Sequence, residues 1–353
     1  MSRLTSLRAL LAPAGVDVLV VSSRENVRYL SGFSGSSGSL LIDETAALLV
    51  TDTRYAEQSA LEAPGFEIEV SGANPSLAAA RRAGSRRVGF EASAIPWDLF
   101  ETMRREVETA GGALTPCRGL VEGLRVVKDA GELELIQRAV DITSAAFEET
   151  LPLVRPGAVE RDLALEIEFR MKRAGAEELS FDLIVASGPR ASLPHGRAGE
   201  RRIGEGEFIV FDIGARFRGY HSDMTRTVFT GRPDDRAREI YRTVLDAQQR
   251  AIARVGPGAA CAEIDATARG AVDEKWPGGF GHGTGHGVGL QVHEAPRIGP
   301  RSDETLSAGM VLTVEPGIYI PGEGGVRIED MVVVTSAGHR IMTPTPKERW
   351  ILE

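Results

Sequence analysis

The chain has 353 residues, of which 42% are hydrophobic and 26% charged, and its formal net charge is −9. This length exceeds the size at which one hydrophobic core stops growing, so we expect a folded protein of two domains. The acidic balance repels phosphate backbones and argues against nucleic acid as a partner.

Cysteine usage and hydrophobic runs exclude two further classes. Cys117 and Cys261 lie far apart and outside any Cys-x-x-Cys pattern, so neither a disulfide framework nor a thiolate zinc site is expected. No apolar run approaches the ~18 residues needed to span a bilayer, and the charged N-terminal residues do not fit a secretory signal. We therefore expect a cytoplasmic protein without membrane association.

The first part of the chain alternates short β-branched runs with helical periods, which indicates an α/β domain. Strands are expected at Val16–Val21, Leu40–Ile42, Ala47–Thr51 and Arg87–Phe90.

Gly111-Gly112 and the Thr115-Pro116 step should end this α/β pattern. Residues 121–127 are expected to form an extended or linking stretch. We place the α/β domain at residues 1–125 and a second domain at residues 126–353.

The second domain should open with a long helix. Asp129 and Glu132 have the spacing of a capping box ahead of periodic apolar residues. Further helices are expected at about residues 160–174, 235–255 and 262–276, and strand-rich stretches at 208–231 and 310–335. Interleaved helices and antiparallel hairpins indicate the α+β class.

Two carboxylates, Asp212 and Asp223, flank an expected turn at residues 217–219. A turn near residues 217 and 218 would place them directly opposite each other, with side chains on one face. Two like charges at that distance are unfavourable unless a cation lies between them. The first hairpin therefore predicts half of a metal site.

The second strand-rich stretch also has two carboxylates that flank a hairpin turn. Glu315 and Glu329 flank a Pro321-Gly322 turn whose midpoint sets the two glutamates opposite each other. In both stretches the first acid is followed two residues later by glycine, which hints at a duplicated half-domain.

A glycine-rich segment between the hairpins contains His282, His286 and His293. Its glycines favour a loop or irregular strand whose backbone approaches a ligand. Four carboxylates with His286 form a hard ligand set that suits Mn²⁺, while Zn²⁺ or Co²⁺ stay compatible with it. The number of ligands predicts two divalent ions, an arrangement typical of metal-assisted hydrolysis.

The segments FDIGARFRGYHSDMTRT, GHGTGHGVGLQVHE, VEPGIY and VRIED together resemble the pita-bread metallopeptidases. The similarity is to the branch that contains Xaa-Pro aminopeptidases and prolidases, and it covers the second domain. It implies that Asp223 and Glu329 bridge two ions, that Asp212 completes one, and that His286 and Glu315 complete the other. It also implies a creatinase-type first domain and a homodimer.

The resemblance extends to residues around the metals. It implies that Glu315 also moves the proton and that His195 or His293 stabilises the tetrahedral intermediate. Arg327 corresponds to an arginine that supports the catalytic site. The implied substrate-binding residues are His282, which would line the pocket, and Arg297, which could meet a terminal carboxylate.

The expected substrate is a peptide with proline at its second position. Residues 29–38 and 51–55 are more similar to aminopeptidases than to prolidases, so we predict an Xaa-Pro aminopeptidase. The alternative is an Xaa-Pro dipeptidase, for which Arg297 would bind the carboxylate of a terminal proline. Methionine aminopeptidase and a non-catalytic peptide-binding relative are further alternatives.

Overall fold

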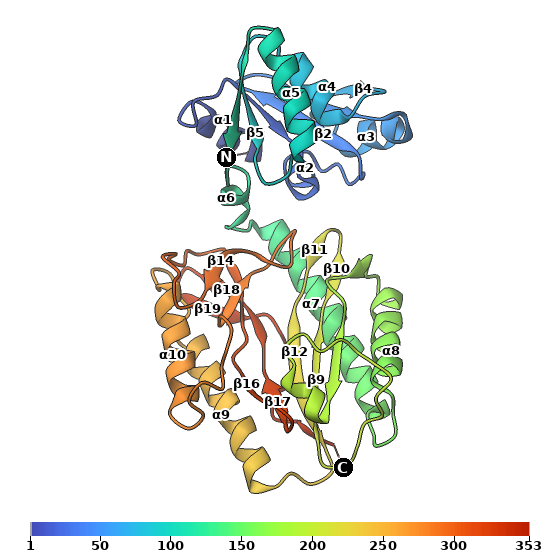
Figure 1. The fold of residues 1–353 in the computed structure, drawn as a ribbon, viewed down its shortest axis with the longest axis vertical. Coiled ribbons are helices and arrows are strands. Elements are labelled where there is room, and N and C mark those ends of the chain that lie inside the picture. The colour runs from blue at the N-terminus through green and yellow to red at the C-terminus, as the bar shows by residue number, and fades with distance from the viewer. Residues whose placement is uncertain (1, 353) are drawn as a thin grey trace. The chain divides into compact units, whose positions relative to one another are not determined.

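The computed structural model describes residues 2–352. The chain forms two compact units, residues 1–125 and residues 126–353, and each is described here by itself (Figure 1). Within residues 2–352 we find no helix with both the length and the apolar character needed to cross a membrane.

The first unit is built on a six-stranded mixed sheet in the order β4-β3-β2-β1-β5-β6. Its strands are β1 (Val18–Val21), β2 (Gly38–Asp43), β3 (Ala47–Thr51), β4 (Glu67–Val70), β5 (Arg87–Glu91) and β6 (Ala113–Cys117). Its helices are α1 (Arg3–Leu11), α2 (Arg24–Ser31), the 3-10 turn η1 (Thr53–Tyr55), α3 (Ala56–Glu62), α4 (Pro75–Ala83), α5 (Trp97–Thr109) and α6 (Glu122–Arg125).

The α/β pattern of the first unit is confirmed, and two local predictions are wrong. The Thr115-Pro116 step does not end the pattern, because β6 runs through it as an edge strand, where the missing N–H of proline is tolerated. Residues 122–125 form the short helix α6, so the stretch where the two units divide is not extended as expected.

The second unit contains the two predicted hairpins and four long helices. Its helices are α7 (Ala130–Thr150), η2 (Leu151–Leu153), α8 (Glu160–Arg173), η3 (Gly188–Ser192), α9 (Asp235–Ile252) and α10 (Cys261–Asp273). Its first strands are β7 (Glu178–Leu179), β8 (Ile184–Ser187), β9 (Phe208–Ile213), β10 (Ala215–Phe217), β11 (Tyr220–His221) and β12 (Met224–Thr230). The later strands are β13 (Gly285–Gly287), β14 (Glu294–Ile298), β15 (Val311–Val314), β16 (Gly317–Ile320), β17 (Gly324–Arg327), β18 (Asp330–Thr335), β19 (Gly338–Ile341) and β20 (Ile351–Leu352).

The predicted helix start at Asp129 is confirmed. The Asp129 side chain accepts from the Glu132 backbone N–H, and the Glu132 carboxylate accepts from the Asp129 N–H, which completes the capping box. The remaining helices begin and end within a few residues of the expected ranges.

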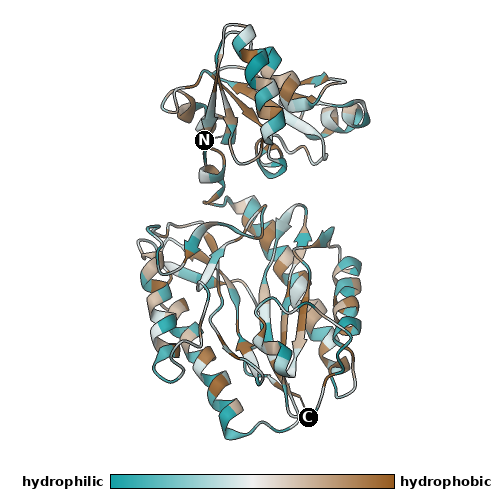
Figure 2. Ribbon diagram, in the orientation of Figure 1, coloured by the Kyte–Doolittle hydropathy of each residue, from teal (hydrophilic) through white to brown (hydrophobic). Residues whose placement is uncertain are grey.

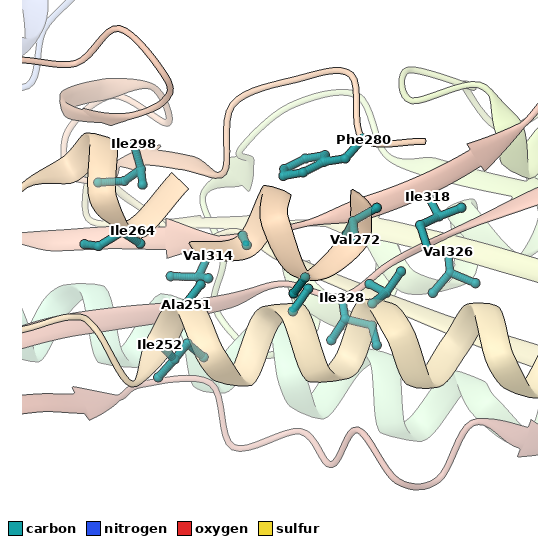
Figure 3. Close-up of a cluster of buried hydrophobic side chains, with 14 of the residues drawn as sticks. Ala251, Ile252, Ile264, Val272, Phe280, Ile298, Val314, Ile318, Val326 and Ile328 are labelled. Carbon is teal, nitrogen blue, oxygen red and sulfur yellow. The ribbon is translucent and has the colours of Figure 1, made fainter. Parts of the chain in front are cut away.

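Two hydrophobic clusters hold the second unit together. One joins α7 and α8 to β8, β9 and β12, and the other joins α9 and α10 to the strands β15 to β18. Figure 3 shows side chains of the second cluster from α9, α10 and the strands pointing toward one another. In Figure 2 the helices carry both brown and teal residues, as expected of helices with one buried and one exposed face. Each half thus has two helices over a sheet, as the duplicated pattern indicates.

The β9–β12 hairpin has a register that differs from the prediction. Its turn is Arg218-Gly219, where both residues have positive φ, +47° and +81°, as a two-residue type I′ turn requires. The turn is centred later than expected, so Asp212 pairs with Thr225 and not with Asp223. Asp223 precedes Thr225 by two residues, so both acids still lie on one face as diagonal neighbours.

The second hairpin has the predicted register. Val314 pairs with Asp330, and Gly317 pairs with Arg327. Glu315 and Glu329 therefore lie opposite each other between the two ladders, as the Pro321-Gly322 midpoint predicts.

Candidate metal centre

The faces of the two hairpins bring the predicted ligands together. Ligand atoms of Asp223, His286 and Glu329 all lie within 4.8 Å of one another. Nε2 of His286 is 3.6 Å from Oδ2 of Asp223 and 3.3 Å from Oε1 of Glu315. Asp212 reaches the same charge cluster from β9, since its charge acts on both Asp223 and Glu329.

Hydrogen bonds from three side chains orient the carboxylates. Thr225 Oγ1 donates to Oε2 of Glu329 at 2.8 Å, and Thr313 Oγ1 donates to Oε1 of Glu315 at 3.2 Å. Arg327 Nη2 donates to Oδ2 of Asp212 at 2.6 Å. We did not predict the two threonines, although each lies two residues from a ligand and thus on the same strand face.

A backbone carbonyl orients the ring of His286 so that it can bind a metal ion. Nδ1 of His286 lies 3.1 Å from the Gly287 carbonyl oxygen. An N–H at Nδ1 that donates to this oxygen turns Nε2 toward the carboxylates, where it hydrogen-bonds Glu315. A metal ion at this place would displace the Nε2 proton and bind the lone pair, as a metal-ligating histidine requires.

The electrostatics of the cluster fit divalent cations. Burial, followed by repulsion from neighbouring carboxylates, raises the pKa of Asp223 and of Glu329 well above their ordinary values. Oδ1 of Asp212 and Oε1 of Glu329 are buried and have no hydrogen-bond partner within residues 2–352. Such oxygens are costly when unpaired, and a metal ion satisfies them directly.

Burial acts to raise the pKa of Glu315, but the hydrogen bond and charge of His286 outweigh it and hold that pKa at about 2. Glu315 is therefore an anion near neutral pH. The donor set of four carboxylates and one imidazole is hard and oxygen-rich, as divalent ions such as Mn²⁺ prefer.

Tyr319 links two predicted residues to the centre and was missed by sequence reasoning. Its hydroxyl lies 2.9 Å from Nε2 of His282 and accepts from Nη1 of Arg327 at 2.9 Å. Arg327 therefore connects this phenol to Asp212. The half-buried His282 forms part of the wall beside the carboxylates.

The other predicted residues surround the cluster. The rings of His286 and His293 are 4.3 Å apart between centroids, and His293 is exposed. His195 is also exposed, and its charge acts on His293. Arg297 pairs with His286 in the β13–β14 ladder, so its exposed side chain leaves the sheet on the same face.

The glycines around His286 lie in the short, irregular strand β13, as predicted, and they let it fit between its neighbours. A Cβ at Gly285 would overlap the Thr313 carbonyl oxygen, and one at Gly287 would overlap that of Ala295. The short strand β13 lies between β14 and β15, and only glycine permits this close approach.

Comparisons with known proteins show which families the two units resemble. The model of metallopeptidase family M24 matches residues 134–336, and that of the creatinase/prolidase N-terminal domain matches residues 3–127. An uncharacterized peptidase of Bacillus subtilis is 42% identical over 99% of this chain and 100% of its own.

Two solved structures share the fold of the whole chain. The Xaa-Pro dipeptidase from Bacillus anthracis superposes with a TM-score of 0.95 at 40% identity, covering 99% of each chain. The X-Pro aminopeptidase from Thermotoga maritima has a TM-score of 0.89 at 35% identity and covers 98% of this chain and 99% of its own.

Proposed function

Because the chain belongs to metallopeptidase family M24, with a creatinase-type first domain and a pita-bread catalytic domain, we propose that it hydrolyses the peptide bond before a proline at the second position. The observation that carries the proposal is the proximity of the ligand atoms of Asp223, His286 and Glu329, all within 4.8 Å of one another. Glu315 lies 3.3 Å from His286, and the charge of Asp212 acts on Asp223. Full-length similarity to an Xaa-Pro dipeptidase and an X-Pro aminopeptidase supports the substrate class.

Five residues would hold two divalent ions: Asp212, Asp223, His286, Glu315 and Glu329. Such ions supply a water of lowered pKa and a polarised scissile carbonyl. We favour Mn²⁺ on the donor chemistry, with Zn²⁺ or Co²⁺ as alternatives.

The chain's own residues account for proton transfer and charge stabilisation. Glu315, an anion beside His286, accepts the proton of the attacking water and returns it to the proline nitrogen. His195 and His293 expose ring nitrogens beside the cluster and donate to the oxygen on which negative charge develops. Arg327 keeps Asp212 oriented and opposes the rise in the pKa of Asp212 that burial causes.

We propose that the preferred substrates are Xaa-Pro dipeptides. Within residues 2–352 the Arg297 side chain makes no ion pair, and it leaves the sheet on the His286 face. A free guanidinium at this place can bind the carboxylate of a terminal proline in a bidentate manner.

The aminopeptidase is the second candidate, because the motifs of the first domain resemble those of aminopeptidases. Several of these residues have structural roles in their own unit. The Tyr29 hydroxyl donates to the Leu124 carbonyl, Asp52 caps η1 and pairs with Arg54, and Tyr55 packs on Phe33. Since folding alone accounts for them, they do not separate the two activities.

Chain-length preference is tested with Mn²⁺-loaded enzyme on Ala-Pro, Ala-Pro amide, Ala-Pro-Ala and Met-Ala-Ser. We expect kcat/KM for Ala-Pro to exceed that for its amide. Arg297→Met should abolish this preference, whereas Arg301→Met, an exposed neighbour, should leave it intact. Faster cleavage of Ala-Pro-Ala would favour the aminopeptidase, and cleavage of Met-Ala-Ser alone would reject both.

A further inference from the structure

Residues 188–199, named here the His195 loop, leave the sheet at the end of β8 and return beside α8. The loop contains η3 (Gly188–Ser192) and carries His195 at an exposed position. Within residues 2–352 the ring of His195 makes no hydrogen bond, so the loop backbone alone determines where the imidazole lies.

A single buried carboxylate binds both ends of this loop. Glu160, the first residue of α8, is 0% exposed. Its Oε1 accepts from the backbone N–H and the hydroxyl of Ser187, both at 2.8 Å. Its Oε2 accepts from Nε of Arg190 at 3.1 Å and from the N–H of Gly199 at 3.2 Å.

The hydrogen bonds of Glu160 to Ser187, Arg190 and Gly199 are named here the Glu160 clamp. Backbone hydrogen bonds add to this clamp where the His195 loop returns to α8. The N–H of Glu160 donates to the Arg201 carbonyl at 3.1 Å, and the N–H of Arg161 donates to the Gly199 carbonyl at 3.0 Å. Glu160 therefore links the start of the His195 loop, at Ser187, to its end, at Gly199, through the first residue of α8.

The far end of the loop touches the metal centre. Nη1 of Arg327 donates to the Pro194 carbonyl at 3.2 Å, directly before His195. Arg327 also holds Asp212. A loop fixed at its base by Glu160 and near its tip by Arg327 places the imidazole relative to the metal ligands.

We propose that Glu160 is a positioning residue for His195, which rests on the peptidase function proposed above. The position requires a carboxylate, because four donors converge on two oxygens that only accept. Glutamine has a single acceptor oxygen, and its amide would face a donor. Glu160→Gln therefore removes half of the clamp without changing the size of the side chain.

Limited digestion with trypsin tests the hydrogen bonds of Glu160 independently of the proposed peptidase activity. Arg197 lies in the loop with its side chain 77% exposed. Loss of hydrogen bonds to a charged group should raise the rate of cleavage after Arg197 roughly tenfold in Glu160→Gln. Glu166→Gln, on an outer face of the same helix, is the matched control and should be cleaved like wild type. Ser187→Ala, which removes one donor, should give a smaller increase.

Kinetics test the positioning role. A misplaced catalytic group costs up to roughly 100-fold in rate, so Glu160→Gln should lower kcat roughly 10- to 100-fold with little change in KM. In a His195→Ala background the same substitution should have almost no further effect on kcat. A merely structural role would give additive losses in both backgrounds.

The outcomes separate the two proposals. Unchanged trypsin cleavage in Glu160→Gln, or additive losses with His195→Ala, would overturn the positioning role. A wild-type enzyme that cleaves no Xaa-Pro bond but shows the trypsin difference would reject the peptidase function and still support the clamp.

Discussion

The guanidinium of Arg327 lies 2.6 Å from the Asp212 carboxylate, and these side chains are only 4% and 15% exposed. Burial acts against the charged form of Arg327, but Tyr319, Asp212 and Glu315 outweigh it and raise its pKa further above its ordinary value. A permanent cation is thereby placed beside four carboxylates. It lowers their repulsion without occupying the ligand positions.

Replacement of Arg327 by methionine should therefore weaken both fold and metal binding. Removing one partner of a buried ion pair costs about 3–5 kcal/mol, which urea unfolding of metal-free protein would measure. Loss of a residue that orients a ligand should weaken metal affinity roughly 10- to 100-fold by calorimetry. Arg232→Met, at an exposed site without an ion pair in residues 2–352, should change stability by no more than about 0.5 kcal/mol.

Asp223→Asn should abolish metal binding but raise the free energy of unfolding of the metal-free protein. The substitution removes a predicted bridging ligand, so metal content per chain and turnover should both fall to background. It also removes one of several mutually repelling buried charges, so the metal-free protein should become more stable. Metal analysis and urea unfolding check the two effects. A metal-free variant with full activity would contradict the proposed centre.

Arg226 holds the backbone of the predicted ligand Glu329. Its Nη1 donates to the Glu329 carbonyl at 2.5 Å, and its Nη2 pairs with Asp330 at 2.7 Å, with both side chains buried. Lys347, near the C-terminus, pairs with the other oxygen of Asp330 at 2.5 Å. The last segment of the chain is thus tied to Asp330, the residue that follows Glu329 and begins β18.

Arg226→Met should lower the free energy of unfolding by about 3 kcal/mol or more, since it breaks a buried pair. The matched control is Arg236→Met, whose ion pair with Glu323 is more than half exposed and should contribute at most about 1 kcal/mol. Equal losses from the two variants in urea unfolding would show that burial of the Arg226 pair is unimportant.

Cys261 gives a prediction for alkaline pH. Burial, followed by the charge of Glu304, raises the pKa of this thiol to about 11. The unfolded chain ionises the thiol near pH 9, whereas the folded chain keeps it protonated up to about 11. The stabilisation from the neutral thiol is therefore complete below about pH 9 and is lost as the pH rises toward 11.

Comparison of wild type with Cys261→Ala isolates this effect from other groups that titrate. Their difference in unfolding free energy should shrink as pH rises from 8 to 11. A difference that does not change over this range would show that the thiol has an ordinary pKa.

Structural features that depend on residues close in sequence could be predicted. The Asp129 and Glu132 capping box and the Pro321-Gly322 hairpin depend on contacts within a few positions, and both occur as expected. The other hairpin was misplaced because Arg218 adopts positive φ, which a glycine signal alone does not indicate. The close approach of Gly285 to Thr313 could not be predicted, because it depends on a strand that lies 28 residues further along the chain.

The sequence by itself determined the chemistry of this protein, because the types and order of the acids and histidines specify a hard ligand set whatever their exact register. The tertiary structure decided how the ligands are supported. Arg327 meets Asp212, and Glu160 closes the His195 loop, across separations of 115 and 39 residues. Such contacts leave no local pattern, since packing of whole elements, and not backbone preference, brings these side chains together.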